Sequence, residues 1–391
     1  MINNVTIKNY KSVVDVSLPL GRFNLLIGAN GCGKSNILEG IALGAAASAD
    51  KLDYEYFANR GIRVVETRFM LPAFEDSEAE VISIAFSNGD NNVATFDIRH
   101  NKDLKPAQWQ DDSVSADRFV TYVVENPPKQ NPLINEMVDL LQKMKSDSPN
   151  PLANIRLKPI NDKVSIMTVD QDLSRFIIYS PEESKLREPN NSNRLYPMGR
   201  HGEGLFAYLK ELSQKNESAN VFNEIKDNLR VLDWFDDMQV PSGQLSMEFD
   251  LKLKDSYLAE TINTFDQRST NEGFLYLLFY LTLVISDETP SFFAIENIDT
   301  AFNPKLCREV VRRLIELARK HDKQIIATTH NPAVLDGLDL SDDEQKLMVV
   351  QRSIDGYTKV RTLKNEQIVN SDLPLSQLWL RGFIGGLPNN F

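Results

Sequence analysis

The stretch Gly28–Ser35 (GANGCGKS) limits the folds open to this chain more than any other segment. It follows the apolar run Phe23–Ile27 and precedes the run Ile37–Ala47, which is rich in Ala, Leu and Ile. The spacing G-x-x-x-x-G-K-[ST] between a buried strand and a helix is typical of a phosphate-binding loop. Its glycines let successive N–H groups and the helix N-terminus face a polyphosphate. We therefore predict a nucleotide site on an α/β sheet.

Each residue type in this loop has an expected task. The Lys34 amine is expected to reach the β- and γ-phosphates, and the Ser35 hydroxyl is expected to ligate Mg²⁺. Cys32 is then a loop residue rather than a nucleophile. With a polyphosphate and Mg²⁺ as the ligands, the predicted phosphate-binding residues are Gly28, Asn30, Gly31, Cys32, Gly33, Lys34, Ser35 and Asn36.

Two later apolar runs end in polar residues that suit the same site. Ser291–Glu296 (SFFAIE) is typical of a buried parallel strand whose tip presents a carboxylate, so Glu296 is the second predicted magnesium ligand. Gln324–His330 (QIIATTH) is a second core strand with His330 at its tip, one helix further along the chain. A Glu or His at a strand end is on its own most often solvated. The phosphate loop upstream favours the functional interpretation.

The overall charge removes one class of function. The 391 residues carry 43 Lys and Arg against 55 Asp and Glu, and this net charge of −12 excludes a uniformly basic nucleic-acid coat. Cys32 and Cys307 are too few for a disulfide framework and favour a reducing compartment. The first residues show no signal-peptide pattern, and the longest apolar run, Phe274–Ile285, is shorter than the roughly 20 residues of a membrane helix. We expect a cytoplasmic protein without a membrane span.

The order of the patterns predicts an α/β head interrupted by other segments. Alternating runs at 81–86 and 93–98, joined across Asn88–Asp90, predict a hairpin in an antiparallel β appendage. Residues 101–239 are irregular and predict a mostly helical inserted subdomain, with helices at 133–144 and 204–212. The later elements return the chain to the head; they are a strand near 245–253, an apolar helix at 274–285, a strand at 292–295, an amphipathic helix at 305–319 and a strand at 325–328. The predicted domains are a head of residues 1–100 and 240–345, an inserted lid or partner-docking subdomain of 101–239, and a C-terminal segment of 346–391 packed on the head.

Several segments together resemble the ABC-type ATPases of the RecF, SMC and OLD-nuclease kind, in the AAA-labelled branch found in bacterial anti-phage systems. The segments that resemble the head motifs are Ile7–Ser12 (opening strand), Glu296–Asn303 (Walker B and D-loop), His330 (switch histidine) and Asn271–Gly273 (signature position). The string Trp379–Phe391, together with Phe57–Arg63, resembles the ATPase subunits of PARIS and Septu-like defence systems.

The resemblance implies an ABC-type P-loop NTPase head with a mixed sheet. In that family two heads sandwich two ATP molecules, the phosphate loop of one facing the signature of the other, which implies a homodimer or higher homo-oligomer. It implies catalytic positions at Lys34, Glu296, Asn297 and His330, and further nucleotide contacts at Asn271, Glu272, Gly273 and Asp299. OLD-type relatives carry a nuclease domain after the head. Because the stretch after His330 is short, we expect any effector to be another polypeptide.

Two positions depart from the family pattern. Asn297 stands where the family usually has the glutamate that activates water, and an amide cannot accept a proton at neutral pH. Slow hydrolysis is expected, with Glu296 or Asp299 as partial substitutes. Asn271 stands where the family has a serine. The sequence leaves open whether Ser269, Thr270 or the Asn271 amide takes over that contact.

These features lead to one function hypothesis and two alternatives. The leading hypothesis is an ATP-binding, slowly hydrolysing sensor of anti-phage defence that controls a separate effector, with a nuclease as the expected effector and a phage protein as a candidate trigger. The first alternative is a RecF- or SMC-like ATPase of DNA repair or maintenance that binds DNA through the basic run Arg308–Lys320, which we otherwise interpret as a solvated helix face. The second is a non-enzymatic scaffold in which ATP only holds an assembly together.

Overall fold

The computed structural model describes residues 1–74, 78–89, 93–101, 108–115, 155–160, 163–168, 172–188, 197–215, 219–240, 251–259, 264–367 and 373–387. The predicted helix at 133–144, the first part of the strand predicted near 245–253, and residues 388–391 of the C-terminal string lie outside these ranges.

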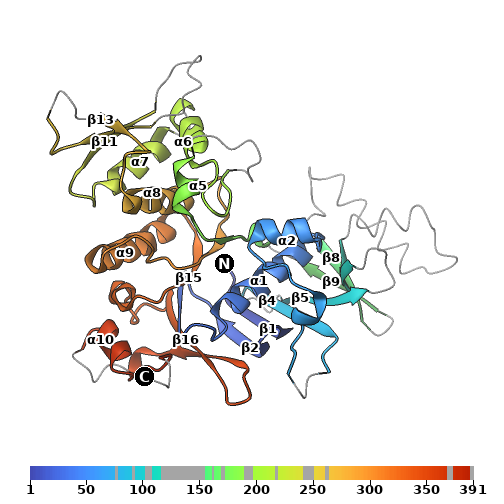
Figure 1. The fold of residues 1–391 in the computed structure, drawn as a ribbon. Coiled ribbons are helices and arrows are strands. Elements are labelled where there is room, and N and C mark those ends of the chain that lie inside the picture. The colour runs from blue at the N-terminus through green and yellow to red at the C-terminus, as the bar shows by residue number, and fades with distance from the viewer. Residues whose placement is uncertain are drawn as a thin grey trace.

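A six-stranded sheet forms the centre of the molecule (Figure 1). Five neighbouring strands run parallel, and the last strand pairs antiparallel at one edge. The predicted alternation of strands and helices is confirmed by this sheet. Its strands, in spatial order, are β10 (Ile178–Tyr179), β14 (Phe292–Ile295), β15 (Gln324–Thr328), β3 (Phe23–Ile27), β16 (Gln345–Arg352) and β17 (Thr358–Leu363).

A second, antiparallel sheet covers the N-terminal side of the head. The predicted hairpin is confirmed as β4 pairing with β5, and both strands extend a sheet begun by β1 and β2. The strands of this sheet are, in order, β2 (Val13–Pro19), β1 (Asn4–Tyr10), β4 (Val81–Ser87), β5 (Val93–Asn101) and β6 (Gln108–Asp111).

Helices fill both sides of the central sheet (Figure 1). Helix α1 (Lys34–Ser48) is buried along nearly its whole length between the two sheets, and a Cβ on Gly44 would lie 2.6 Å from the Phe86 ring. This close approach of helix to strand requires glycine. On the opposite face, α8 (Glu272–Ile285) and α9 (Pro304–Lys320) bury their apolar residues against the sheet. None of the helices in the described part of the chain has the length and apolar character that crossing a bilayer requires.

The segment 101–239 contributes to several parts of the molecule. Its described residues hold strands as well as helices, and β10 pairs with β14, so residues 178–179 belong to the head sheet. The buried stripe of α6 (Leu205–Gln214) agrees with the predicted helix at 204–212. The division of the chain into head, insert and C-terminal segment stays a prediction.

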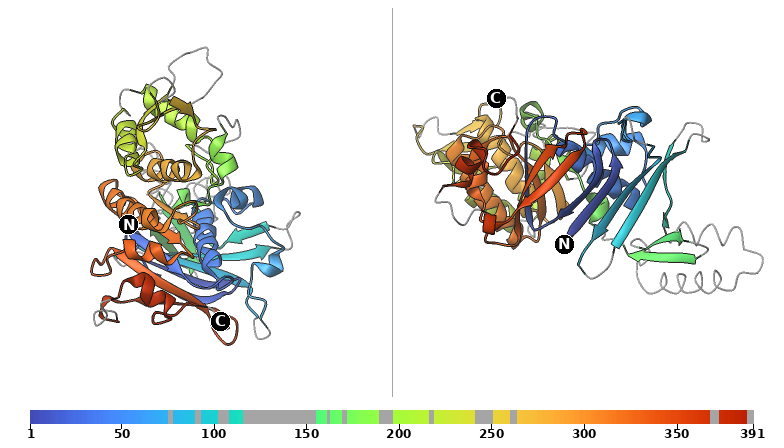
Figure 2. Two further views of the ribbon diagram at one scale, coloured as in Figure 1. Left: turned by 60° about the vertical axis from the view of Figure 1, so that its left-hand side comes forward. Right: turned by 90° about the horizontal axis from the view of Figure 1, so that it is seen from below.

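Two small antiparallel sheets lie at the periphery. In the right-hand view of Figure 2, the sheet of β7 (Val114–Ser115), β8 (Ile155–Ile160) and β9 (Lys163–Thr168) lies beyond β5, away from the central sheet. The sheet of β11 (Phe235–Gln239), β12 (Lys252–Asp255) and β13 (Thr264–Asp266) joins α7 (Ala219–Leu229) and α8 in an upper lobe. The remaining helical elements are α2 (Tyr54–Arg60), α5 (Glu183–Arg187), the 3-10 helices η1 (Thr67–Phe69), η2 (Leu173–Arg175), η5 (Pro332–Gly337) and η6 (Asn365–Gln367), and α10 (Leu375–Leu380).

Candidate nucleotide site

The predicted phosphate loop joins β3 to α1 in a conformation that only glycine accepts at two points. Gly33 caps α1 with φ = 113°, and a Cβ there would lie 2.1 Å from the Thr358 hydroxyl oxygen. A Cβ on Gly28 (φ = 151°) would lie 2.2 Å from the Val350 carbonyl oxygen. Positive φ is strained for a residue with a Cβ, so the loop keeps this curl only with glycine. The curl leaves the N-terminus of α1 open toward a ligand.

Lys34 folds back over the loop that precedes it. Its Nζ donates hydrogen bonds to the carbonyl oxygens of Gly28 (2.8 Å) and Ala29 (3.2 Å), and the side chain is largely buried. Burial lowers the pKa of the Lys34 amine, and the nearby Cys32 and Glu296 oppose this effect. A phosphate oxygen would supply a charged acceptor in place of these neutral carbonyls, which makes the amine a ready anion-binding group.

A cavity of about 370 Å³ opens beside the loop. Its walls contain most of the predicted site residues, which far-apart parts of the chain bring together. Arg63, Thr328 and Arg352 also line it, and the sequence reasoning assigned them no role. The predicted residues in the walls are Asn30, Gly31, Cys32, Gly33, Lys34, Ser35, Asn36, Glu296, Asn297 and His330; Gly28, Asp299 and residues 271–273 are not among the lining residues.

Glu296 reaches the cavity because β14 ends next to it. The Glu296 N–H donates to the Tyr179 carbonyl oxygen (2.8 Å), which extends the pairing of β14 with β10 by one residue. On the other side the Asn297 N–H donates to the Thr328 hydroxyl at the end of β15 (3.0 Å). Parallel strands that end together thus place an acid opposite the phosphate loop.

Asn297 adopts a left-handed backbone conformation, with φ = 51°. Its carbonyl oxygen accepts hydrogen bonds from the N–H and the hydroxyl of Thr300, which close a tight turn. Asn tolerates this region better than most residues that carry a side chain. The exposed amide therefore stands at the cavity wall in a conformation that the turn fixes.

His330 and Asp299 are joined through Thr329. The Thr329 hydroxyl donates to Asp299 Oδ1 (2.6 Å), which ties the turn after β14 to the end of β15. Burial and then the nearby Lys34 lower the pKa of His330, while Asp299 opposes them. The imidazole is therefore neutral at pH 7, and Asp299 is linked to the cavity-lining His330 through the neighbouring Thr329.

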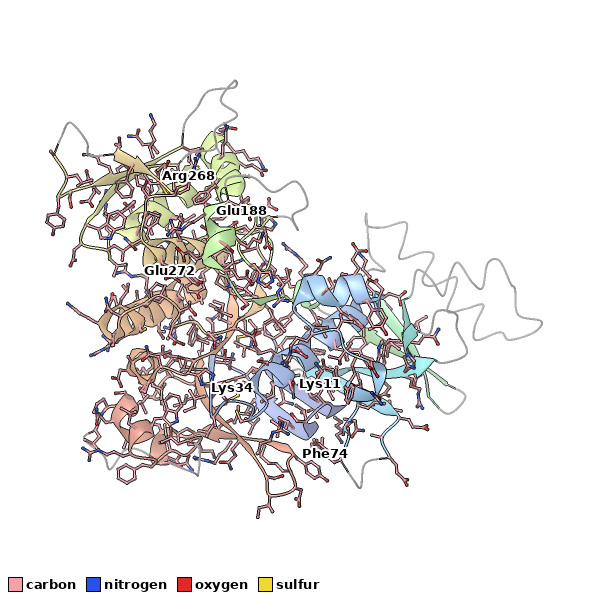
Figure 3. All side chains as sticks on the ribbon, viewed as in Figure 1. Lys11, Lys34, Phe74, Glu188, Arg268 and Glu272 are labelled. Carbon is pink, nitrogen blue, oxygen red and sulfur yellow. The ribbon has the colours of Figure 1, made fainter. Side chains whose placement is uncertain are left out.

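Residues 271–273 lie apart from the cavity. Figure 3 shows Glu272 on the upper lobe and Lys34 in the central part of the molecule. The Asn271 side chain caps α8 by accepting a hydrogen bond from the Phe274 N–H (2.9 Å), and the Ser269 hydroxyl donates to Asp266. Within one chain, the structure does not bring the predicted signature position to the phosphate loop.

A buried acid fixes Arg63 beside the cavity. The Glu39 side chain on α1 is 2% exposed and forms ion pairs with both Lys11 and Arg63. Arg63 also donates to the Asn36 side-chain oxygen (3.0 Å). No spacing in the sequence pairs these residues. In the sequence, Arg63 appears only as the last residue of the string Phe57–Arg63, which resembles defence ATPases. That resemblance implied no function for Arg63.

Arg200 adds a further cation near Glu296, besides Lys34 and Arg63. Its carbonyl oxygen accepts from the Ser180 N–H (2.9 Å), directly after β10, and its buried Nε has no hydrogen-bond partner among the described residues. Burial lowers the pKa of this guanidinium, and Glu296 is the strongest of the carboxylates that oppose the effect. The sequence reasoning missed this residue, because the strand that positions it has only two residues.

The ligand chemistry of the walls suits a nucleotide with Mg²⁺. Mg²⁺ binds hard oxygen ligands and keeps few protein contacts when a phosphate shares it. The Ser35 hydroxyl and the Glu296 carboxylate both line the cavity and supply such oxygens. In the described part of the chain, no group of three or more His, Cys, Asp or Glu side chains gathers to form a separate metal site.

A parallel sheet with a glycine loop after β3, a buried lysine and an acid at the end of β14, with β15 between these two strands, defines an ABC-type P-loop NTPase head. The chain belongs to the AAA ATPase domain family, which matches residues 1–287. It is therefore an ATPase of that family, with ATP as its substrate.

Two solved structures share the fold. One is an Smc head bound to the C-terminal winged-helix domain of ScpA, with a TM-score of 0.53, 16% identity, and coverage of 94% of this chain and 99% of that chain. The other is an Smc head with an extended coiled coil bound to the C-terminal domain of ScpA from Pyrococcus furiosus, with a TM-score of 0.50, 13% identity, and coverage of 94% and 97%. At these identities the likeness shows the fold alone. No curated protein sequence matches the chain significantly.

Proposed function

We propose that this protein is an ATP-dependent switch of a cytoplasmic anti-phage defence system that binds ATP tightly, hydrolyses it slowly and controls a separate effector protein, expected to be a nuclease. The observation that carries the proposal is the pairing of a complete phosphate-binding wall with Asn297, where a general base would stand. The resemblance of Phe57–Arg63 and Trp379–Phe391 to defence ATPases supports the biological setting.

The mechanism follows from the residues on two sides of the nucleotide cavity, the phosphate loop and the strand ends opposite it. The loop N–H groups and Lys34 bind and orient the phosphates, while Ser35 and Glu296 would hold Mg²⁺, whose charge polarises the γ-phosphate. Asn297 can orient a water molecule through its amide but cannot take its proton. ATP therefore stays bound longer than in a head with a glutamate at this position, and a conformation that favours ATP persists with it.

Two heads complete the site in this proposal. The phosphate loop of one copy faces Asn271–Gly273 of the other, because those residues lie on a different lobe from Lys34 in each chain. Bound ATP then joins two copies and makes the homodimer sensitive to nucleotide. The Smc heads that share this fold are bound to domains of ScpA, and by analogy we propose that this head also binds a separate protein.

The DNA-maintenance alternative depends on free cations along α9. Three of the five cations of that run are paired within the chain: Arg313 with Glu309, Arg319 with Asp342 and Glu344, and Lys320 with Glu224. These pairs reduce the positive charge that a DNA backbone would meet, which favours the switch. Duplex DNA binding that weakens steeply with salt would support the alternative.

Phage plating on cells that carry the gene with its native neighbours tests the proposal. We expect protection that needs both a neighbouring gene and Lys34, so the gene alone and a Lys34→Ala version should not protect. Lack of protection against a broad phage panel would contradict the defence role.

A further inference from the structure

A second cavity, of about 620 Å³, adjoins the nucleotide cavity. It lies between the phosphate loop, β16 and the chain after α10, and shares Asn30, Cys32 and Arg352 with the nucleotide cavity. We call residues 380–387 the C-terminal wall; all of them except Phe383 and Ile384 line this cavity. The other lining residues are Ala29, Val350, Gln351, Leu380, Arg381, Gly382, Gly385, Gly386 and Leu387.

The second cavity is positively charged, although the chain as a whole is acidic. Arg352 and Arg381 are the charged residues among those that line it, and none of the described lining residues is a carboxylate. Arg352 donates to the carbonyl oxygens of Gly31 (3.0 Å) and Gly356, whereas the Arg381 guanidinium forms no ion pair or side-chain hydrogen bond with any described residue. A free guanidinium favours a carboxylate partner.

Exposed apolar side chains lie in the same segment as Arg381. Leu380 is 56% exposed, Phe383 69% and Leu387 36%, and all three belong to the C-terminal wall. Leu380 and Leu387 line the cavity, and Phe383 lies between them in the sequence. Single exposed apolar residues are ordinary, but three in one short segment mark an interaction surface. Behind them the Trp379 indole is buried, its N–H has no hydrogen-bond partner among the described residues, and a Cβ on Gly386 would lie 3.7 Å from that nitrogen.

The C-terminal wall also packs directly on the phosphate loop. A Cβ on Gly386 (φ = 79°) would lie 2.8 Å from a Val349 methyl carbon and 3.4 Å from the Gly28 Cα. On the other side of the same loop, Arg352 holds the Gly31 carbonyl oxygen. Any ligand that shifts the C-terminal wall or Arg352 therefore acts on the loop that binds phosphate.

We propose that this cavity and its apolar border are the docking site for an acidic peptide segment with apolar side chains, contributed by a partner protein, and that docking and nucleotide binding influence each other. A carboxylate of the segment pairs with Arg381 and Arg352, and its apolar residues cover Leu380, Phe383 and Leu387. Identifying this partner with the controlled effector rests on the proposed function, whereas the docking site itself does not. By reciprocity, ATP changes peptide affinity by the same factor by which peptide changes ATP affinity.

Selection from a displayed library of random dodecapeptides on the purified full chain tests the proposal. We expect enriched peptides that combine Asp or Glu with Leu, Phe or Trp. Their affinity, measured by fluorescence polarisation, should fall at least tenfold in Arg381→Glu and in Phe383→Ser. Ile354→Ser is the control, because Ile354 is an exposed apolar residue on the turn between β16 and β17 and does not line the cavity, so this variant should bind normally.

Lys34→Ala separates this inference from the proposed function. The wild-type chain should bind peptide without nucleotide whether or not it is an ATP-dependent switch, and Lys34→Ala should lose the effect of ATP on peptide affinity. Enriched peptides without acidic residues, or binding that both wall variants leave unchanged, would overturn the proposal. It would equally be overturned if Phe383→Ser only abolished self-association, or if Arg381→Glu only abolished binding of a labelled DNA duplex.

Discussion

The two walls of the nucleotide cavity are built in different ways. The phosphate loop is a single stretch, Gly28–Asn36, whose conformation follows from its own glycines and from the helix after it. The opposite wall is assembled from the ends of β14 and β15, the segment after α2 and the end of β16. A wall made of one contiguous segment can be recognised from a sequence motif. A wall made of several strand ends depends on the order of strands in the sheet. If the two walls also divide nucleotide binding from hydrolysis, changes in one wall should affect ATP affinity most and changes in the other should affect the hydrolysis rate most.

Removing the Lys34 amine from the phosphate loop should have the largest effect on ATP affinity. Lys34→Ala deletes a charged donor to phosphate, which is worth about 1.5–3 kcal/mol or roughly 10- to 150-fold in affinity. We expect this loss of ATP affinity by equilibrium titration, and no detectable phosphate release. Lys8→Ala, on the exposed surface of β1, is the control and should bind ATP normally. Normal ATP binding by Lys34→Ala would show that the loop is not the phosphate site.

Changing Glu296, in the wall opposite the phosphate loop, should affect hydrolysis without abolishing ATP binding. Glu296→Gln keeps the shape of the side chain but removes the charge that would hold Mg²⁺, so hydrolysis should fall roughly a hundredfold or more while ATP binding persists. Asp299→Asn is the matched control, because Asp299 does not line the cavity, and it should lose less activity. If Asp299→Asn lost as much as Glu296→Gln, Asp299 would share the chemistry.

Two glycines of the loop offer a matched pair. Gly31 and Gly33 both have positive φ, but a Cβ on Gly31 meets nothing within 4 Å, whereas one on Gly33 meets Thr358. Backbone strain alone costs about 1–3 kcal/mol. Gly33→Ala should therefore destabilise the protein more than Gly31→Ala in chemical denaturation. Equal losses would mean that Thr358 does not brace the loop.

The smallest expected effect concerns His330. Its folded-state pKa is lowered, so the native state binds fewer protons than the unfolded state once the pH falls below about 6.5. Stability should be constant above that pH and should decline slightly as the pH falls toward the lowered folded pKa. His330→Gln should remove this part of the pH dependence in thermal unfolding. An unchanged pH profile in the variant would assign the dependence to other groups.

The sequence predicted those elements whose structure depends on residues adjacent in the chain. The phosphate-loop glycines, the strand of Phe292–Ile295 and the helix at 274–285 each follow from local spacing. Arg63 and Arg200 could not be predicted in the same way. Arg63 is fixed by the buried Glu39 across the fold, and Arg200 follows a two-residue strand that no periodic pattern reveals. Arg352 reaches both cavities only because β16 pairs with β3.

The role of Asn297 gives the most direct test of the account. Single-turnover hydrolysis of ATP with Mg²⁺ should be measured for the wild-type protein and for Asn297→Glu, each at saturating nucleotide. A general base is worth about 10²–10⁴-fold, and the left-handed backbone at position 297 will take part of that gain from glutamate. We predict clearly faster hydrolysis by the variant with little change in ATP affinity. Equal rates would contradict the claim that Asn297 makes this head a slow switch.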